Sequence, residues 1–499
     1  MNRGVLALDQ GSHASRACIF DAHGALLANA TVPVATRHPA PLQVEQDAVE
    51  LLESVRAAAT QALHAARARQ PGLELVAAGL AVQRSTLVCC SRRDGSALTP
   101  ALSWQDQRNA AWLAGLAAYA PRVRELTGLP LSPHYGASKL RWCLDHLAPV
   151  ARAAAAGELL AAPLASYLAW QLCEGRGAPR VDAANASRTL LFDPAQLDWS
   201  DELLRCFAIE RAWLPEYAPT RADWGTLRVA DNAVPLRALT GDQSAVPYAT
   251  GDPDIGTVYV NLGTGAFIQR PLNLRPPAPA PLLGSVLSSD HDAALYSLEG
   301  TVNGAGSAVS WFCEQERCDE PPLWAALEEI PARSALPVFL NGVGGLGSPW
   351  WRSNMEPRFL AAQDAPGPAP APPPPPPPEA RMARFAARIE SIAFMITVNA
   401  QLLEAQAGPP RRVLLAGGMS RSKWLCRRLA SLLDLPVEAI DAEASARGVA
   451  RLAARDFTAH WATPASAHYA PEPDAALHER YARFTAGMAA STGRGANLG

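Results

Sequence analysis

The 499-residue sequence lacks the features of several protein classes. Only 18% of residues are charged, and 44 basic residues nearly balance 47 acidic ones, for a net charge of −3. No excess of positive charge is therefore available to bind nucleic acid or an anionic membrane surface. Nine cysteines are scattered singly or as the vicinal Cys89-Cys90, without the paired couplets of a structural zinc site. Their odd number in a long chain also argues against a disulfide framework.

Long hydrophobic runs are missing as well. The first residues, MNRGVLALDQGSHASR, turn polar after five or six positions, too early for the core of a signal peptide. Charges, glycine or proline interrupt every apolar stretch before it reaches the length of a membrane span. We therefore expect a soluble, cytoplasmic protein with no membrane or nucleic-acid partner.

The residues that are present describe an ordinary globular chain with 49% apolar residues and enough length for two or three domains. Its first segment predicts a β-hairpin, with strands at 5–9 and 17–20 around the polar turn 10–15. A second strand–turn–strand begins at 256–262, turns at Gly263-Thr264-Gly265 and continues to 269. One such hairpin in each half suggests a duplicated α/β architecture with two related lobes.

Other segments follow from periodicity and turn residues. Helices are expected at 48–69, 380–406, 420–433, from about 444 and at 474–490, and strands at 75–82, 87–90 and 412–415. The region 107–235 is rich in helix formers broken by glycine and proline. Residues 364–378 read DAPGPAPAPPPPPPP, which predicts a solvated polyproline spacer or a disordered loop.

Four short motifs carry the chemical signals, and each has a simpler alternative. Asp9 ends a strand before a Gly-Ser turn, which suits Mg²⁺ and phosphate but equally suits an ordinary turn. The turn 263–265 allows close approach to a phosphate or merely a tight bend. Asp242 is a candidate general base or a helix cap. Gly417-Gly418 fits a flat ring or a strand-to-helix turn.

In order along the chain, these motifs match one family. The blocks are ALDQGSHASRACIFD, AVQRSTLVCCSRRDGSALTPALSWQDQR, YGASKLRWCLDH, AANASRTLLFD, LTGDQSAV, VNLGTGAF, LEGTVNGAGSAVSWF, GGLGSPWW, LLAGGMSRSKWL and EASARGVARLA. The sequence resembles the FGGY carbohydrate kinases, and within them the glycerol kinases. The resemblance implies a two-lobed, actin-like ATPase fold of the ribonuclease H type with a central cleft. It also implies ATP-dependent phosphorylation of a hydroxyl on a small polyol or sugar, with Mg²⁺.

The same resemblance implies roles for individual residues. Asp242 matches the catalytic base and Asp9 the residue that organises the metal. Residues that match the nucleotide and phosphate contacts are Ser12, His13, Arg16, Gly263, Thr264, Gly265, Gly306, Ser310, Gly417, Gly418 and Ser422. Residues that match the acceptor contacts are Arg84, Ser85, Trp104, His134, Tyr135, Asp242 and Gln243.

The expected domain boundaries follow from the same resemblance. We expect an N-terminal lobe over 1–245, a C-terminal lobe over 246–460 that contains the spacer 364–378, and a tail over 461–499 with one helix. The family also implies a homodimer or homotetramer.

The acceptor residues depart from the glycerol-kinase pattern. The family sequence Gln-Arg-Glu-Thr is here Gln83-Arg84-Ser85-Thr86, so a carboxylate is replaced by a short hydroxyl. The glycerol-contacting tyrosine aligns with His134, although a one-residue shift would restore Tyr135. These changes leave open a pentulose kinase of the xylulokinase or ribulokinase type. A catalytically inactive sugar or nucleotide sensor is a further alternative, but Asp9, Asp242 and Thr264 are all present.

Overall fold

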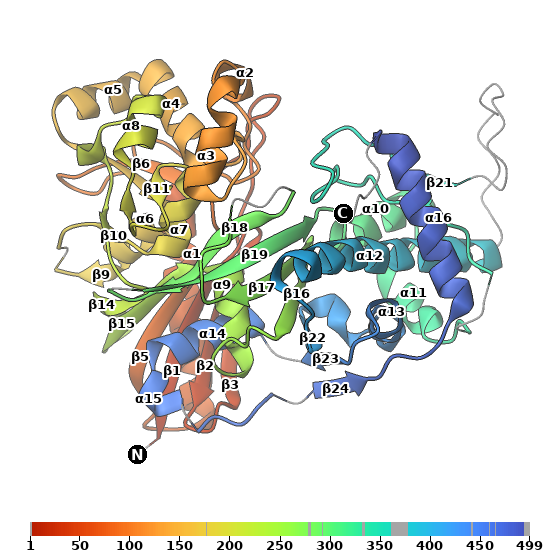
Figure 1. Ribbon diagram of the computed structural model, residues 1–499. Coiled ribbons are helices and arrows are strands. Elements are labelled where there is room, and N and C mark those ends of the chain that lie inside the picture. Colours follow the sequence, from red (N-terminus) through yellow and green to blue (C-terminus); the bar gives the residue numbers. More distant parts are fainter. Residues whose placement is uncertain are drawn as a thin grey trace.

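The computed structural model describes residues 2–175, 177–277, 281–291, 293–331, 335–360, 378–440, 443–458, 460–464 and 466–493. Two seven-stranded sheets form the cores of two bodies that lie side by side (Figure 1). Most of the predicted spacer 364–378 lies outside the described residues.

The first sheet has the strand order β3-β2-β1-β5-β15-β14-β9. These strands are β1 (Arg3–Gln10), β2 (Ala14–Asp21), β3 (Leu26–Pro33), β5 (Glu74–Val82), β9 (Cys173–Glu174), β14 (Arg221–Val229) and β15 (Asn232–Gly241). β1 is antiparallel to β2 and parallel to β5, which in turn is parallel to β15. The N-terminal hairpin predicted from the sequence is thus confirmed.

The second sheet has the order β18-β19-β17-β16-β22-β23-β24. Its strands are β16 (Thr257–Leu262), β17 (Ala266–Leu272), β18 (Leu283–Ser289), β19 (Ala294–Val302), β22 (Arg412–Ala416), β23 (Val437–Ile440) and β24 (Ser466–Tyr469). β16 is antiparallel to β17 and parallel to β22, which is parallel to β23. Both sheets therefore repeat one local pattern, an antiparallel hairpin followed by parallel strands, which confirms the expected duplication.

Helices cover the sheets as their apolar periodicity requires. α1 (Ala48–Arg69) coincides with the predicted 48–69; the side chain of Asp47 caps it by accepting from the backbone N–H groups of Val49 and Glu50. The second sheet packs on α12 (Pro378–Ala407), which is buried along Phe385, Ile389, Ile392 and Ile396. Further helices of this body are α10 (Gly306–Glu316), α11 (Glu320–Leu327), α13 (Lys423–Leu433) and α16 (Ala475–Thr492).

A helical layer lies above the first sheet (Figure 1). It contains α2 (Ala110–Ala114), α3 (Ala120–Thr127), α4 (Gly136–His146), α5 (Ala148–Ala155), α6 (Leu164–Leu172), α7 (Ala183–Ala186) and α8 (Asp201–Phe207). A four-stranded sheet supports it, in the order β4 (Glu45–Gln46), β7 (Ala101–Leu102), β6 (Leu87–Ser91) and β8 (Leu159–Pro163). Short pairs complete the fold: β10 (Arg180–Val181) with β13 (Glu216–Tyr217), β11 (Phe192–Asp193) with β12 (Asp198–Trp199), and β20 (Phe339–Leu340) with β21 (Arg358–Phe359).

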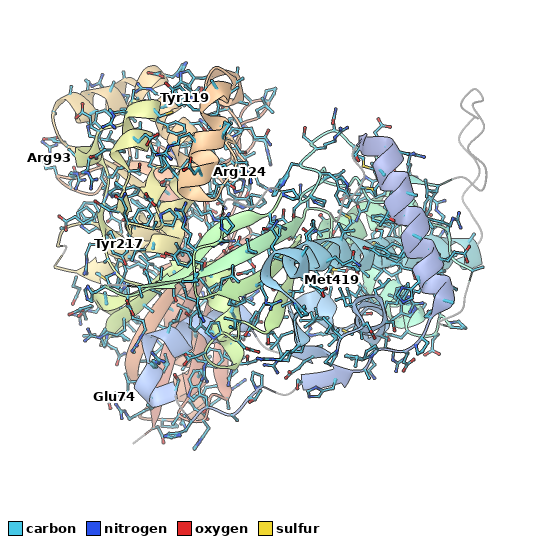
Figure 2. The ribbon with its side chains drawn as sticks, in the orientation of Figure 1. Glu74, Arg93, Tyr119, Arg124, Tyr217 and Met419 are labelled. Atoms are coloured by element: carbon cyan, nitrogen blue, oxygen red, sulfur yellow. The ribbon has the colours of Figure 1, made fainter. Side chains whose placement is uncertain are left out.

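The helical layer also touches the second sheet. The backbone N–H of Gly284 donates to the carbonyl of Gly128 at 2.9 Å, next to β18. Arg124, labelled in Figure 2, donates from Nη1 to the carbonyl of Leu282 at 3.4 Å. A Cβ on Gly128 would lie 3.1 Å from the backbone of Gly284, so the two backbones approach closely here. The helical layer of the first half of the chain is thus joined to the second sheet at the start of β18.

One late helix returns to the first sheet. α14 (Ala444–Ala453) packs with residues of β1, β2 and β5 in a single apolar cluster, and Figure 1 shows this blue helix against those red strands. The packing is backbone to backbone, since a Cβ on Gly79 would lie 2.5 Å from the carbonyl oxygen of Val449. A Cβ on Gly448 would lie 1.9 Å from that of Ala245. The residue Ala245 belongs to α9 (Asp242–Ala245), and the short α15 (Arg455–Thr458) follows α14 in the chain.

Two further sequence observations are resolved by the fold. The glycine-rich stretch 342–347 opens no helix; Gly344 and Gly345 instead have φ of 70° and 75° in a loop. All nine cysteines have free thiols, with Cys89 and Cys90 buried in β6. Within the described ranges, no helix combines the length and the apolar character that crossing a membrane requires.

Candidate active site

Three of the predicted site residues meet at one edge of the first sheet because parallel strands end there together. Asp9 lies opposite Ala81 of β5, and Gly241 of β15 lies opposite Val82. Asp9 is the last residue but one of β1, Arg84 lies two residues after β5, and Asp242 lies one residue after β15. The charge of Asp242 acts on Asp9, and that of Arg84 acts on Asp242. The carboxyl ends of neighbouring parallel strands are where α/β proteins gather functional side chains.

Asp242 is the first residue of α9 and is half-buried. Gly241, and not Asp242, is the N-cap residue of this helix. The Asp242 carboxylate accepts from the backbone N–H of Gln243 at 2.7 Å and from its Nε2 at 3.2 Å. Burial raises the pKa of Asp242, and the Arg84 guanidinium opposes that rise. A fixed carboxylate with raised basicity is suited to accept a proton from a hydroxyl group.

Asp9 is the second carboxylate of this edge. The hydroxyl of Ser445, from α14, donates to its Oδ2. Burial raises the pKa of Asp9 to about 6, and the negative charges of Asp242 and Glu443 add to the rise. Arg16, in β2, forms an ion pair with Glu443. Two carboxylates that raise each other's proton affinity would be stabilised by a cation between them or beside them.

The donor set fits Mg²⁺ held mainly by phosphate. Among the described residues, no three His, Cys, Asp or Glu side chains converge to form a complete metal cage. Mg²⁺ in phosphoryl-transfer enzymes is usually held by one or two carboxylates together with phosphate oxygens and water. Asp9, with Asp242 nearby, supplies that minimum.

The predicted acceptor residues form one connected group. Trp104 Nε1 donates to Ser12 Oγ at 2.8 Å, and Ser12 Oγ donates to Gln83 Oε1 at 3.2 Å. The ring of Trp104 lies 5.7 Å from that of His134, centroid to centroid, and His134 lies 4.9 Å from Tyr135 edge-on. These contacts join the turn that is predicted to bind phosphate to the segments that are predicted to bind the acceptor.

Trp104, His134 and Tyr135 form a wall of neighbouring aromatic rings. Tyr135 is buried, and burial raises its pKa. Burial lowers the pKa of His134 well below its ordinary value, and the positive charges of Lys139, Arg188 and Arg84 lower it further. His134 is therefore a neutral ring at neutral pH, able both to donate and to accept a hydrogen bond.

Arg84 is bound to a carboxylate that sequence reasoning did not assign. Arg84 Nη1 donates to Glu299 Oε1 at 2.7 Å and Nη2 donates to Oε2 at 3.0 Å. Arg188 donates to the same carboxylate, and all three side chains are buried. The two arginines hold the pKa of Glu299 at about 2 despite its burial. Glu299 and Arg188 both lie inside matching sequence blocks, a signal that could have drawn attention to them.

Ser85, the departure from the family pattern, has a strained position. Its φ is 65°, in the left-handed region that favours glycine. Its Oγ is buried and has no hydrogen-bond partner among the described residues. The neighbouring Arg84 explains why position 241 is glycine, since a Cβ there would lie 2.6 Å from Cγ and Cδ of Arg84. Gln243 is also fixed, with Asn261 Nδ2 donating to its Oε1 at 3.0 Å.

The predicted nucleotide residues of the C-terminal half lie at the second sheet, whereas Ser12, His13 and Arg16 belong to the first hairpin. The turn 263–265 is bound to the start of α10, where the N–H of Gly306 donates to Gly263 O and that of Ser307 to Thr264 O, both at 3.0 Å. A Cβ on Gly306 would lie 2.7 Å from Gly263 O, so only glycine allows this approach. Thr264 and Ser310 are exposed.

Gly417 and Gly418 differ in their surroundings. Gly417 has φ of 92°, and a Cβ on it would lie 2.4 Å from Leu262 O, so packing alone accounts for this glycine. A Cβ on Gly418 would meet nothing within 4 Å, which leaves open space above it. Ser422 caps α13 and donates to Glu328 Oε1 at 2.8 Å, and His13 is exposed on the first turn.

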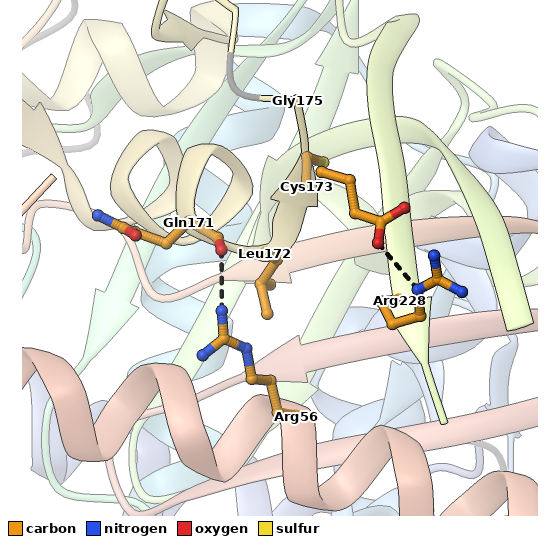
Figure 3. A pocket seen from close by; sticks show the side chains of 7 residues that line it. Arg56, Gln171, Leu172, Cys173, Gly175 and Arg228 are labelled. Carbon is orange, nitrogen blue, oxygen red and sulfur yellow. Dashed lines mark hydrogen bonds and ion pairs between the residues drawn. The ribbon is translucent and has the colours of Figure 1, made fainter. Parts of the chain in front are cut away.

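A separate hollow of about 540 Å³ lies on the side of the first body (Figure 3). Arg56 donates to the carbonyl of Gln171 at 3.0 Å, and Arg228 Nε lies 2.8 Å from a Glu174 carboxylate oxygen. None of the predicted site residues lines it. Its ionic groups are paired with neighbours, and we assign it no chemistry.

Comparison with known proteins identifies the family. The model of the FGGY family of carbohydrate kinases, N-terminal domain, matches residues 4–255, and that of the C-terminal domain matches residues 258–457. A glycerol kinase from Alkalilimnicola ehrlichii is 34% identical over 475 residues, which cover 93% of this chain and 92% of that protein.

Solved structures agree on the fold. The crystal structure of Plasmodium falciparum glycerol kinase with ADP has a TM-score of 0.85 at 20% identity and covers 98% of both chains. That of xylulose kinase from Rhodospirillum rubrum has a TM-score of 0.79 at 20% identity and covers 98% of this chain and 99% of that one. The fold is thus the two-lobed, actin-like architecture expected from the sequence. The matched family models define the class of the protein as carbohydrate kinases, which are phosphotransferases. Within this class the chain belongs to the FGGY family of carbohydrate kinases.

Proposed function

We propose that this kinase transfers the γ-phosphoryl group of ATP to a hydroxyl of a small polyol or sugar. The observation that carries the proposal is the convergence of Asp9, Arg84 and Asp242 at one sheet edge, beside a wall of Trp104 and Tyr135. The identity with glycerol kinases over nine-tenths of the chain supports a polyol acceptor.

Asp242 is assigned as the general base. Its carboxylate takes the proton of the acceptor hydroxyl as that oxygen attacks the γ-phosphorus in line. Its backbone and side-chain bonds to Gln243 hold it in place, and its raised pKa increases its proton affinity. Phosphoryl transfer depends mainly on such positioning and on electrostatic stabilisation.

The phosphates and the nucleoside are assigned to the two turns and the second sheet. Ser12, His13, Arg16 and the turn 263–265 are assigned to the phosphate oxygens, and the close contact of Gly306 with Gly263 supports the turn 263–265. The open space above Gly418, with exposed Ser310, suits the flat base and the ribose. Gly417 and Ser422 are assigned to the same pocket. Gly417 allows the close backbone packing beneath it, and Ser422 caps α13 next to it.

Asp9 is the residue assigned to Mg²⁺. When bound, this ion supplies neutralisation of charge on the phosphate oxygens. Asp9 is held by Ser445 and faces the charge of Asp242, so its carboxylate is oriented before any ligand arrives.

The acceptor is assigned to Arg84, Ser85, Trp104, His134, Tyr135 and Gln243. Trp104 offers an apolar face for the carbon chain, while the neutral His134 and the Tyr135 hydroxyl offer donors and acceptors. A pentulose kinase is a second candidate, favoured by Ser85, whose side chain is smaller than the glutamate of the family pattern and carries no charge.

The test is an ADP-release screen with Mg²⁺-ATP across glycerol, erythritol, ribitol, xylulose and ribulose, each against an acceptor-free blank. Acceptor-dependent ADP release, with the phosphorylated product detected by mass, supports the proposal. Binding of nucleotide and acceptor without turnover would instead support the sensor alternative.

Nine free thiols fit a reducing cytoplasm, where we place the protein. A homodimer or homotetramer remains a prediction that light scattering would test.

A further inference from the structure

Lysine is almost absent from this chain. The sequence holds 44 basic residues other than histidine, of which only Lys139 and Lys423 are lysines. Lys139 is 1% exposed and ranks among the largest fully buried side chains. A chain that uses arginine nearly everywhere has kept a lysine at one buried position, so the chemistry of that position requires explanation.

The surroundings of Lys139 explain the choice. Its Nζ donates to three backbone carbonyls: Ser85 O at 3.0 Å, Ser103 O at 2.7 Å and His134 O at 2.7 Å. An ammonium group has three donors in a compact tetrahedral arrangement, whereas a guanidinium presents a planar fork. Three carbonyls that converge on one point therefore match lysine and not arginine.

The three carbonyls belong to the three segments that carry the acceptor residues. Ser85 follows Arg84, Ser103 precedes Trp104, and His134 precedes Tyr135. These segments come from different places in the fold: the β5–β6 connection, the turn after β7, and the loop before α4. Lys139 is thus a single point where all three are held together.

Stability of its own helix does not explain this cation. Lys139 is in the first turn of α4, where the helix dipole disfavours positive charge. Burial lowers its pKa to about 7, although Asp106 opposes the shift, so an ammonium here is costly. The gain that offsets this cost lies in the three carbonyl bonds.

We propose that Lys139 is a positioning residue that fixes the geometry of the acceptor pocket by joining its three segments. This rests on the proposed function, because the pocket is the one assigned to the polyol or sugar. Without the ammonium, three buried carbonyls lose their donor and the segments separate. The nucleotide residues of the second sheet have no bond to Lys139 among the described contacts.

The test compares Lys139→Met with Arg92→Met. Arg92 lies in the same half of the chain and also donates to three backbone carbonyls, Leu159 O, Ala212 O and Leu214 O, at 2.8–3.0 Å. None of those carbonyls adjoins an acceptor residue. Both variants lose hydrogen bonds to three backbone carbonyls, but only Lys139→Met loses them in the proposed acceptor pocket.

We expect Lys139→Met to raise the KM for the acceptor about ten- to a hundredfold while the KM for ATP changes less than about twofold. Arg92→Met should lower Tm with both KM values near those of the wild type. Lys139→Arg keeps the charge and should not restore the acceptor KM. If Lys139→Met does not fold, Lys139→Gln retains amide donors for some of the carbonyls and should show a smaller rise.

An unchanged acceptor KM in a folded Lys139 variant would overturn the inference, and so would equal rises in both KM values. Full rescue by Lys139→Arg would show that charge alone is needed and would also overturn it. Each variant is measured beside the wild type on its best acceptor. A wild type without acceptor-dependent turnover would refute the proposed function instead, which keeps the two failures distinguishable.

Discussion

Arg84 and Glu299 form a bidentate ion pair between the two halves of the chain, with N–O distances of 2.7 and 3.0 Å. Arg84 follows a strand of the first sheet, and Glu299 lies in β19 of the second. Arg188 binds the same carboxylate. The proposed acceptor pocket therefore has a carboxylate beside Arg84 even though position 85 is serine, but that carboxylate already binds two arginines.

Glu299→Gln should destabilise the protein by about 3–5 kcal/mol, because it leaves two buried guanidinium groups without their counter-charge. The effect should depend on pH. The pKa of Glu299 is lowered from 4.5 to about 2, so its contribution is complete above the ordinary value and is lost as pH falls toward 2. Urea unfolding from pH 7 to pH 3 should show the difference between wild type and variant narrowing below about pH 4.5.

The control is Glu174→Gln, which removes an exposed pair with Arg228 and should cost less than about 1 kcal/mol. A wild-type-to-Glu299→Gln difference that stays constant over the whole pH range would contradict the assigned ionisation.

Asp242→Asn should reduce turnover by about a hundredfold or more, since the amide cannot take the proton of the acceptor hydroxyl. Its size and its bonds to Gln243 allow the fold and ATP binding to persist. Steady-state kinetics, with nucleotide binding measured by calorimetry, would check both. Asp198→Asn, which alters a surface pair with Arg211, serves as a control that should leave turnover unchanged. Near-normal activity of Asp242→Asn would remove Asp242 from the role of base.

Glycerol should not be the best acceptor. Loss of a charge-assisted bond at position 85 weakens recognition of a small terminal hydroxyl by roughly 1.5–3 kcal/mol, or about ten- to a hundredfold. The smaller side chain of serine, in place of the family's glutamate, favours a tetritol, pentitol or ketopentose. Catalytic efficiencies on glycerol, erythritol, ribitol, xylulose and ribulose, measured side by side, test this. Glycerol as the best substrate, with a micromolar KM, would refute it.

Ser85→Glu is expected to move the preference toward glycerol. Ser85→Gln has the same length without the charge and should move it less. Equal shifts in the two variants would mean that volume, and not charge, governs the choice.

Ser12→Ala should weaken binding of both substrates. Its Oγ accepts from Trp104 Nε1 and donates to Gln83, so it links the phosphate turn to the acceptor wall. An unpaired indole N–H costs about 1–3 kcal/mol when buried. We expect the KM for ATP and the KM for the acceptor to rise together, unlike the split expected for Lys139. Ser466→Ala, at an exposed hydroxyl beside His468, is the neutral comparison.

Local signals in the sequence predicted the parts of the fold that local interactions determine. The N-terminal hairpin and the helix at 48–69 were both expected at or near their observed positions. Glu299 was not given a role, because its partner Arg84 is 215 positions away. Lys139 was missed for the same reason, since its three carbonyls are brought together only by tertiary packing. The nucleotide and metal roles carried over from the family remain predictions.

The return of α14 to the first sheet has a consequence for biosynthesis. β1 and β5 are made before residue 83, yet the helix that covers their alanine-rich face with Val449 and Ala450 begins only at Ala444. During synthesis the first body therefore keeps an uncovered apolar face until α14 has been made, so it cannot mature before that point. A nascent chain arrested before Ala444 should be sensitive to protease within β5, and release of the complete chain should abolish that sensitivity.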